Sequence, residues 1–208
     1  MDYVYPVFMF FSLFFIFLTL IVYLLLPDLR NGPFGKLVIC FLVNALINYF
    51  FTGYSRSLSL TGQVLTHQPI CYFLAYTNYL TFLAMFFWMN AMTITITYKL
   101  TKIKAHKQQM SSKKFLLIIL YGQGIPILLT IILALIDSYG ACDGSIILPN
   151  IAKYNCFIGT NDNESFLQSP KFLYFYLIVL IIVIINIICF IHTGIFLTKQ
   201  HAETKSIK

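Results

Sequence analysis

The chain has 208 residues and a formal net charge of +7, and 59% of its residues are apolar, 17% aromatic and 10% charged. Ordinary soluble domains carry about 25% charged residues, and the mean hydropathy here is +0.82. The composition therefore excludes a soluble globule. It also excludes a disordered chain, which would be poor in apolar residues. Five cysteines in the whole chain are too few for a scaffold built on disulfides.

Five stretches without Lys, Arg, Asp or Glu have about the 20-residue length that a helix needs to cross a bilayer. In chain order they are 4–26, 37–54, 71–98, 115–136 and 172–197. We predict that each is a helix, because a backbone that faces lipid must satisfy its own hydrogen bonds. The predicted fold class is therefore an all-α polytopic membrane protein with five transmembrane helices.

The first stretch, 4–26, resembles a signal peptide only in its position. No basic region precedes it, since Met1 and Asp2 begin the chain. Its apolar run is too long for a signal peptide, and no cleavage site with two small residues follows it. We therefore interpret it as a retained transmembrane helix.

The distribution of Lys and Arg predicts the orientation. If the N-terminus is outside, eleven of these residues lie in inner segments and three in outer segments. Cytoplasmic loops of membrane proteins carry such an excess. The one N-x-[ST] sequon begins at Asn163, in a predicted outer loop, which indicates a glycosylation site. The C-terminus is then cytoplasmic.

The inner loop between the third and fourth spans is strongly basic and contains no acid. Its lysines are Lys99, Lys102, Lys104, Lys107, Lys113 and Lys114. One interpretation is a membrane anchor that contacts anionic lipid. The other is a surface that meets a cytoplasmic partner. The positive charge follows the membrane topology, so we expect no nucleic-acid partner.

The spans contain almost no ionisable side chain, and only Asp137 lies near the outer end of one. Transporters and intramembrane enzymes generally need such groups, and no catalytic motif occurs. We therefore expect no enzymatic activity, metal site or cofactor. The polar residues expected inside the membrane are Asn44, Asn48, Asn90, Gln123 and Asn186. We interpret them as interhelical contacts, each worth about 0.6 kcal/mol, in preference to ligand contacts.

The cysteines divide by depth. Cys40 and Cys189 lie inside spans and are expected to be free thiols. Cys71, Cys142 and Cys156 lie on the outer, oxidising side, where disulfides form. A bridge from Cys71 would pin the long outer loop over the bundle, and the residues alone leave both Cys142 and Cys156 as its partner.

Five local patterns occur in the order found in one receptor class. They are L-P-D-L-R-N at 26–31, F-F-W-M-N at 86–90, G-Q-G-I-P at 122–126, L-P-N-I leading to C-F at 148–157, and I-N-I-I-C-F-I at 185–191. The chain thus resembles the secretin/adhesion class of G-protein-coupled receptors, and more narrowly the Methuselah-like receptors. The resemblance implies a plasma-membrane receptor for an unidentified extracellular ligand, coupled to a heterotrimeric G protein. It also implies a Cys71–Cys156 disulfide.

The chain departs from this class in several places. Gln123 stands where the class has Trp, and Met92 where it has an intramembrane Glu. No ectodomain precedes the first span and no sixth or seventh helix follows the fifth, so we expect residues 1–208 to be a partial receptor domain. Residues 198–208 would then be a cytoplasmic tail or the start of the third inner loop.

Two expectations follow from the missing helices. The faces that carry Asn90 and Asn186 would be left toward lipid or another chain, with unsatisfied amides. The alternative to a receptor is a five-helix membrane protein without signalling, which would act as a scaffold, dimer partner or transport subunit.

Overall fold

The computed structural model describes residues 4–60, 69–102, 112–139, 147–153, 156–159 and 169–206. These residues form helices and two short irregular loop segments, 147–153 and 156–159, without a strand in the described part. The end of the bundle that carries this loop is called outer and the end that carries Lys99 is called inner, after the orientation that the sequence predicts. Two of the helical elements are single π-helical turns, labelled η. The elements in chain order are α1 Val4–Leu25, α2 Pro27–Asn31, α3 Pro33–Leu60, α4 Pro69–Lys102, α5 Ser112–Ile119, η1 Leu120–Gly124, α6 Ile125–Tyr139, η4 Phe172–Tyr176 and α7 Leu177–Ser206.

The predicted all-α class and the five membrane-crossing helices are confirmed. Helical stretches in the described residues that are long and apolar enough to cross a membrane are Pro6–Leu25, Phe34–Leu58, Pro69–Thr101, Lys113–Tyr139 and Phe172–Gln200. Most extend past the predicted ends by several residues. The prediction stopped at the first charge or turn residue, whereas a helix can continue into the polar headgroup region once it leaves the hydrocarbon core.

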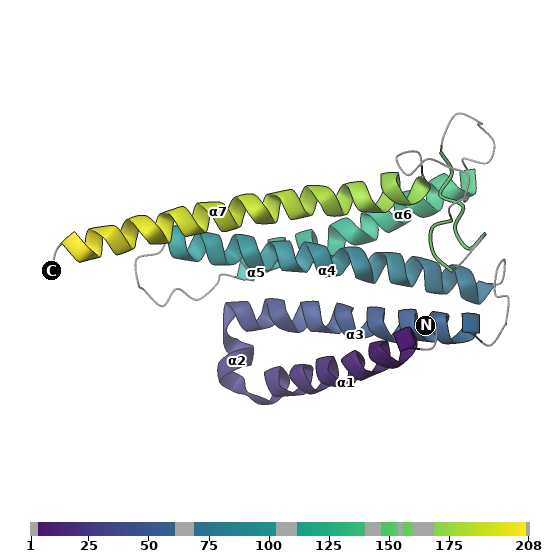
Figure 1. The fold of residues 1–208 in the computed structure, drawn as a ribbon, viewed down its shortest axis with the longest axis horizontal. Helices are drawn as coiled ribbons and strands as arrows, with labels where there is room; N and C mark the ends of the chain where they lie inside the picture. Colours follow the sequence, from purple (N-terminus) through teal and green to yellow (C-terminus); the bar gives the residue numbers. More distant parts are fainter. Residues whose placement is uncertain are drawn as a thin grey trace.

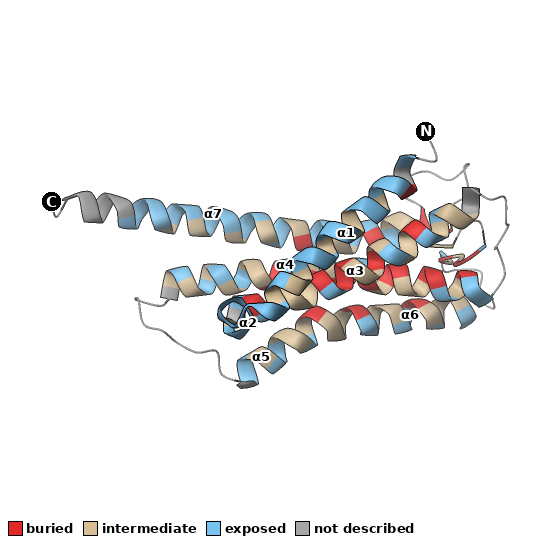
Figure 2. Ribbon diagram, turned by 90° about the horizontal axis from the view of Figure 1, so that it is seen from below, coloured by how far each residue is buried: buried red, intermediate tan, exposed pale blue. Residues whose placement is uncertain are grey.

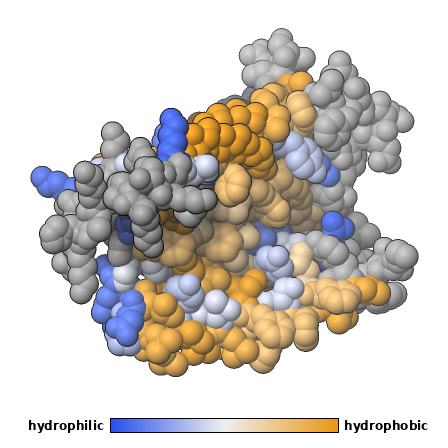
Figure 3. Space-filling view, turned by 60° about the vertical axis from the view of Figure 1, so that its left-hand side comes forward, coloured by the Kyte–Doolittle hydropathy of each residue, from blue (hydrophilic) through white to orange (hydrophobic). Residues whose placement is uncertain are grey.

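The helix α4 occupies the middle of the arrangement (Figure 1). It packs against α3 on one side and against α7, η1 and α6 on the others, and α1 packs on the far side of α3. Figure 2 shows that the buried residues gather along α3 and α4, whereas α1 and much of α7 are exposed. Side chains of high hydropathy cover much of the face seen in Figure 3, as expected for surfaces that face lipid.

The connection between the first two spans is more helical than the sequence suggested. The predicted spans end at residue 26 and resume at residue 37, but Pro27 begins the five-residue helix α2 and Pro33 begins α3. Proline is favoured in the first turn of a helix, where its missing N–H would have had no partner. Gly35 permits the sharp return of the chain, since a Cβ there would lie 1.7 Å from the carbonyl oxygen of Leu29.

The fourth and fifth spans each contain a π-helical turn, which the apolar pattern did not predict. In η1 the N–H of Ile125 donates to the carbonyl oxygen of Leu120, and in η4 the N–H of Leu177 donates to that of Phe172. Pro126 lies two residues after the end of η1, and a proline ring clashes with the carbonyl four residues earlier in a regular helix. A wider turn relieves this clash. A π turn also adds one residue and often marks a functional site.

Candidate functional site

The first polar junction joins three spans at Gln123. Its Oε1 atom accepts hydrogen bonds from Asn44 Nδ2 of α3, at 3.1 Å, and from Trp88 Nε1 of α4, at 3.2 Å. Asn44 also donates to the carbonyl oxygen of Cys40, at 2.9 Å. Gln123 itself lies in the π turn η1. A single amide oxygen therefore holds α3, α4 and η1 in one register.

The indole ring of Trp88 packs directly on the backbone of the same π turn. A Cβ added to Gly122 would lie 2.8 Å from both Cδ2 and Cε2 of Trp88, so any larger residue would push the ring away. Trp88 is only 2% exposed. Gly122 leaves room for the indole ring of Trp88, and Gln123 accepts the hydrogen bond from the indole N–H.

The second polar junction lies around Asn90, which is completely buried. Its Nδ2 donates to Asn186 Oδ1 of α7 at 2.9 Å, and its Oδ1 accepts from the hydroxyl of Tyr121 in η1. The expectation that Asn90 and Asn186 are left with unsatisfied amides is therefore wrong. The two helices turn these faces toward each other, and no buried side-chain N or O atom in the described residues lacks a partner.

A third set of polar contacts joins α3 to α4. Asn48 Nδ2 donates to Thr81 Oγ1 at 3.1 Å and to the carbonyl oxygen of Asn78 at 3.3 Å, and Thr52 Oγ1 donates to Asn78 Oδ1 at 3.4 Å. Asn44, Asn48 and Thr52 recur every four residues, so they form one stripe along α3. Asn44 and Asn48 of this stripe were predicted from the sequence, and the same four-residue spacing leads to Thr52.

Contacts between α4 and α7 keep a nearly constant register along the two helices. The partners Asn90–Asn186 and Thr97–Thr193 are both separated by 96 residues, and the latter pair has an oxygen–oxygen distance of 2.9 Å. Nearer the outer end, Tyr79 donates to the carbonyl oxygen of Tyr174 with a separation of 95. The difference of one residue falls across η4, and one residue is what a π turn inserts. The change of one residue in the spacing of the contacts between α4 and this span therefore coincides with η4.

Several residues of these junctions were missed by the sequence analysis. They are Thr52, Asn78, Tyr79, Thr81, Trp88 and Tyr121. Tyrosine and tryptophan counted as apolar in the search for spans, although each carries one polar atom that finds a partner when buried. Asn78 and Thr81 lie on the face of α4 that meets α3, which differs from the face of Asn90 toward α7.

The outer end of the bundle is closed by a loop that a disulfide ties to α4. The structure contains the Cys71–Cys156 bond that the resemblance implied, with a Cα–Cα distance of 4.8 Å. Ile151, Ala152 and Ile158 of this loop are buried in a cluster with the outer parts of α4, α6 and η4. The loop therefore contributes to the core and does not merely cross over it.

The loop reaches this position through an unusual backbone. Asn150 and Ala152 have φ values of 47° and 58°, in the left-handed region that few non-glycine residues adopt. The N–H of Ile151 between them donates to Asp137 Oδ1 at 3.3 Å, and the Tyr174 hydroxyl donates to the carbonyl oxygen of Ile147 at 2.8 Å. Asp137, near the end of the fourth span, thus holds the loop on α6.

The outer end also holds a positive pair. Burial lowers the pKa of the Lys171 ammonium, and the nearby charge of Arg56 lowers it further. Arg56 lies near the end of α3 and Lys171 directly before η4. These two cations come from helices on opposite sides of α4.

The inner end carries the described part of the basic loop. Lys36 Nζ lies 5.4 Å from the ring centroid of Phe115, and Lys114 Nζ lies 5.6 Å from that of Tyr98. Lys99 is half-buried and lines a groove. Lys113 is exposed. The predicted residues Lys104 and Lys107, the side chain of Lys102, the sequon residue Asn163 and Cys142 lie outside the described residues.

The described residues hold no cluster of metal-binding side chains. They contain no group of three His, Cys, Asp or Glu side chains that could hold a metal ion. Their free cysteines are Cys40 and Cys189, as expected for thiols inside spans. The helix α4 connects the two ends of the bundle. A disulfide joins it to the outer loop, hydrogen bonds join it to three other spans, and its Tyr98 ring contacts Lys114 at the inner end.

A central helix that is tied to an outer loop by a disulfide and joined to its neighbours through buried amides is an arrangement suited to a polytopic membrane receptor. The chain matches the family of seven transmembrane receptors described as the Secretin family over residues 1–208. It belongs to this family, and it is a multi-pass membrane protein.

Among curated proteins, the chain is similar to receptors of the Methuselah-like group, as the sequence patterns indicated. It is 30% identical to probable G-protein coupled receptor Mth-like 6 of Drosophila melanogaster over 191 residues, which is 91% of this chain and 36% of the relative. It is 29% identical to G-protein coupled receptor Mth2 of Drosophila yakuba over 187 residues, which is 90% of this chain and 33% of the relative. The chain thus spans about a third of the length of these relatives.

Proposed function

We propose that residues 1–208 form helices 1–5 of a seven-helix receptor domain, and that the receptor passes an extracellular signal to a heterotrimeric G protein. The family match along the whole chain carries this proposal. The relatives that it resembles are named as G-protein coupled receptors. The geometry supports it, because α4 is tied to the loop by a disulfide, is joined to neighbouring spans by buried hydrogen bonds and carries Lys99 near its other end.

The test of signalling is nucleotide exchange on G proteins co-expressed with the chain. In this class the sixth helix is the element that moves, and a switch needs an element with two packings for a ligand to bias. We therefore expect residues 1–208 alone to give no exchange above background. A chimera that adds the following two helices of Mth-like 6 should give exchange. Exchange from 1–208 alone at equal surface level, or none from a chimera that reaches the surface, would contradict the proposal.

The proposed location is the plasma membrane, with the N-terminus outside and the C-terminus in the cytoplasm. The eleven-to-three distribution of Lys and Arg supports this orientation. A cysteine placed at Asp162 should react with an impermeant thiol reagent added to intact cells, and one placed at Lys107 should not. The opposite labelling pattern would overturn the topology. An Asn163→Gln variant should lose the mass of one glycan.

The roles of the two ends follow from this orientation. The outer loop held by Cys71–Cys156 and the residues around it would face the unidentified extracellular ligand. The lysines at 99–114 would contact anionic lipid, the G protein or both, because all lie on the cytoplasmic side. The residues 198–208 would begin the third inner loop. Asn44, Asn48, Asn90, Gln123 and Asn186 are proposed as packing contacts that hold the bundle together.

The alternative function, a five-helix scaffold or subunit without signalling, is favoured by one observation. No buried side-chain N or O atom in the described residues lacks a hydrogen-bond partner, so the buried polar side chains described here find their partners within this chain. The exchange assay separates the two functions. A scaffold would give no exchange in the chimera either, and it would instead co-purify with a second membrane chain in stoichiometric amount.

A further inference from the structure

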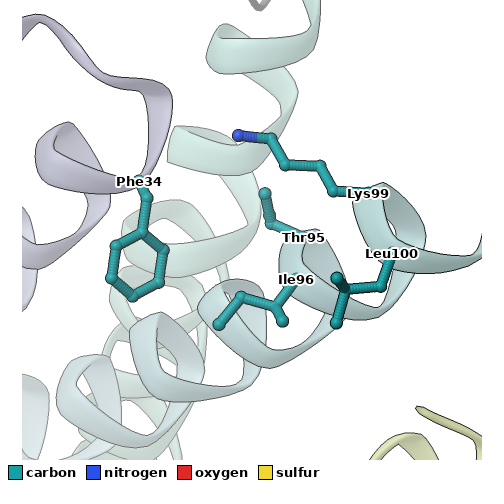
Figure 4. Close-up of a pocket in the computed structure, with 5 residues that line it drawn as sticks. All are labelled: Phe34, Thr95, Ile96, Lys99 and Leu100. Atoms are coloured by element: carbon teal, nitrogen blue, oxygen red, sulfur yellow. The ribbon is translucent and has the colours of Figure 1, made fainter. Parts of the chain in front are cut away.

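A groove of about 240 Å³ opens at the lysine-rich end between the start of α3 and the end of α4. Its lining residues are Phe34, Thr95, Ile96, Lys99 and Leu100 (Figure 4). One water molecule takes about 30 Å³ in the liquid, so the groove is large enough for an extended group. Its volume and its position at the end of a membrane span define the kind of ligand that fits.

The walls of the groove are apolar except at one edge. Phe34, Ile96 and Leu100 supply aromatic and aliphatic surface. The hydroxyl of Thr95 is already used, since it donates to the carbonyl oxygen of Ala91 at 2.7 Å. Lys99 is therefore the one charged group among the lining residues, and Figure 4 shows its stem running past Thr95 with the nitrogen beyond it.

The depth of the groove matches the boundary between hydrocarbon and headgroups. At 1.5 Å per residue, the 34 residues of α4 extend for about 50 Å, whereas the hydrocarbon core is about 30 Å thick. Lys99 lies near the end of α4 and so falls at headgroup level. Thr95 and Ile96 lie about one turn deeper and fall in the acyl region.

The surroundings of the groove add positive charge. Lys36 is two residues from Phe34 and lies over Phe115, and Lys114, next to Phe115, lies over Tyr98 beside Lys99. These contacts bring three lysines from α3, α4 and α5 to one end of the bundle. The ammonium groups of Lys36 and Lys114 lie over aromatic rings and Lys99 borders the groove, so positive charge gathers where an anion would bind.

We propose that this groove binds one anionic glycerophospholipid. Its phosphate and anionic headgroup lie against Lys99, Lys36 and Lys114, and one acyl chain lies along Phe34, Thr95 and Ile96. The combination of a cationic edge with an apolar trough distinguishes this site from general attraction of a basic surface to a membrane. The site would couple the packing of α3 on α4 to the composition of the leaflet at that end.

Trp88 provides the measurement, because it is the one tryptophan in the chain and lies on the same helix. Thr95 is seven residues away, about 10 Å along the axis, which is within range for energy transfer. The full chain in phosphatidylcholine nanodiscs would receive phosphatidylserine labelled on its acyl chain with an acceptor for tryptophan emission. We expect saturable transfer that unlabelled phosphatidylserine displaces and phosphatidylcholine does not.

Variants separate the headgroup from the acyl contact. Lys99→Gln should weaken the apparent affinity about fivefold, the effect of one lysine at an anionic membrane surface, and Lys99→Arg should retain it. Thr95→Phe fills the trough and should weaken binding at unchanged charge. Lys199→Gln, which removes an exposed lysine at the same end outside the groove, should change the affinity less than twofold.

Three results would overturn the proposal. They are equal transfer from labelled phosphatidylserine and phosphatidylcholine, an equal loss in Lys99→Gln and Lys199→Gln, and full affinity in Thr95→Phe. The Lys99→Arg variant keeps the positive charge. If it folds but loses as much affinity as Lys99→Gln, the site does not depend on charge, which also contradicts the proposal. The emission maximum of Trp88 before addition of lipid checks the fold of each variant.

Discussion

The helices α1 and α4 are both apolar spans, yet they use their side chains in opposite ways. Among the α1 residues of described burial, Pro6 alone is buried, and the Thr19 hydroxyl donates to Phe15 of its own helix. In contrast, α4 supplies Trp88 and Asn90 to the core, with bonds to α3, η1 and α7 through these and other side chains. The more polar of the two helices is therefore the more buried.

This order reverses the rule for soluble proteins and follows from the solvent. In lipid an apolar side chain gains little by leaving its surroundings, so helices associate through close packing and interhelical hydrogen bonds. A polar side chain without a partner costs several kcal/mol in hydrocarbon, so the residues that look least suited to a membrane decide where the helices meet. The contrast between α1 and α4 therefore predicts which substitutions lower the stability of the chain and which do not.

The largest effect is expected from removal of the disulfide at the outer end of α4. Cys71→Ser or Cys156→Ser should lower the free energy of unfolding by about 2–4 kcal/mol, because the bond closes a long loop of the chain with a separation of 85 residues. The measurement is thermal unfolding of the purified chain in detergent. Cys189→Ser is the matched control, since its thiol is free. Equal stability of Cys156→Ser and Cys189→Ser would contradict the idea that the loop is part of the core.

A substitution at the contact between η1 and Trp88 should be next in size. Gly122→Ala places a Cβ 2.8 Å from the indole ring, and overpacking of a filled core costs about 1–3 kcal/mol. The emission of Trp88 should shift as the ring moves and its N–H leaves Gln123. Unfolding monitored by this single tryptophan reports both effects.

Gly194→Ala is the matched control, because nothing lies within 4 Å of its added Cβ. It should be neutral or slightly stabilising, since alanine favours a helix over glycine by about 1 kcal/mol. A loss of stability in Gly194→Ala as large as that in Gly122→Ala would show that the effect is general to glycine in these spans.

The amide pair between α4 and α7 should contribute less. Asn90→Leu removes the donor to Asn186 and the acceptor of Tyr121, and bonds of this kind in membranes average about 0.6 kcal/mol with a maximum of about 1.7. We expect a loss of about 1–2 kcal/mol. Thr93→Val is the control, because the hydroxyl of Thr93 is bonded to its own helix.

A double-mutant cycle tests whether the two amides act together. Asn90→Leu with Asn186→Leu should cost less than the sum of the single changes, because each single change leaves the other amide with one partner fewer. Strict additivity would indicate that the two side chains satisfy themselves independently and would argue against the pairing of α4 with α7.

Particular residues show which parts of the structure could be predicted from the sequence. The five spans followed from charge-free runs, since length and composition alone decide what crosses a bilayer. Asn44, Asn48, Asn90, Gln123 and Asn186 were found because amides are rare in such runs, although Asn78, an amide in the span 71–98, was missed. Their partners could not be derived, because helical periodicity defines a face and not the neighbour that it meets.

The backbone of the π turns and of the outer loop also could not be predicted from the sequence. Nothing in the apolar pattern of 172–176 distinguishes η4 from a regular turn, and only the bond from the Leu177 N–H to the Phe172 carbonyl oxygen identifies it. The positive φ at Ala152 lies beside the bond from the Ile151 N–H to Asp137, and neither feature follows from the sequence pattern of the loop. The Cys71–Cys156 bond came from the family resemblance, since the residues alone left Cys142 open.

The smallest effect is expected on α1, and it gives the sharpest test of the comparison. Phe8 is 64% exposed and Phe87 of α4 is 7% exposed. Phe8→Leu exchanges one lipid-facing apolar side chain for another, so stability should change by less than about 0.5 kcal/mol. Phe87→Leu also removes the edge-to-face contact with Tyr121, whose ring centroids lie 5.3 Å apart, and such contacts are worth about 0.5–1.5 kcal/mol. The same substitution thus separates a lipid-facing position from a core position at equal change in volume. If Phe8→Leu destabilised the chain as much as Phe87→Leu, the exposed face of α1 would have to pack against protein, and the assignment of that face to lipid would be wrong.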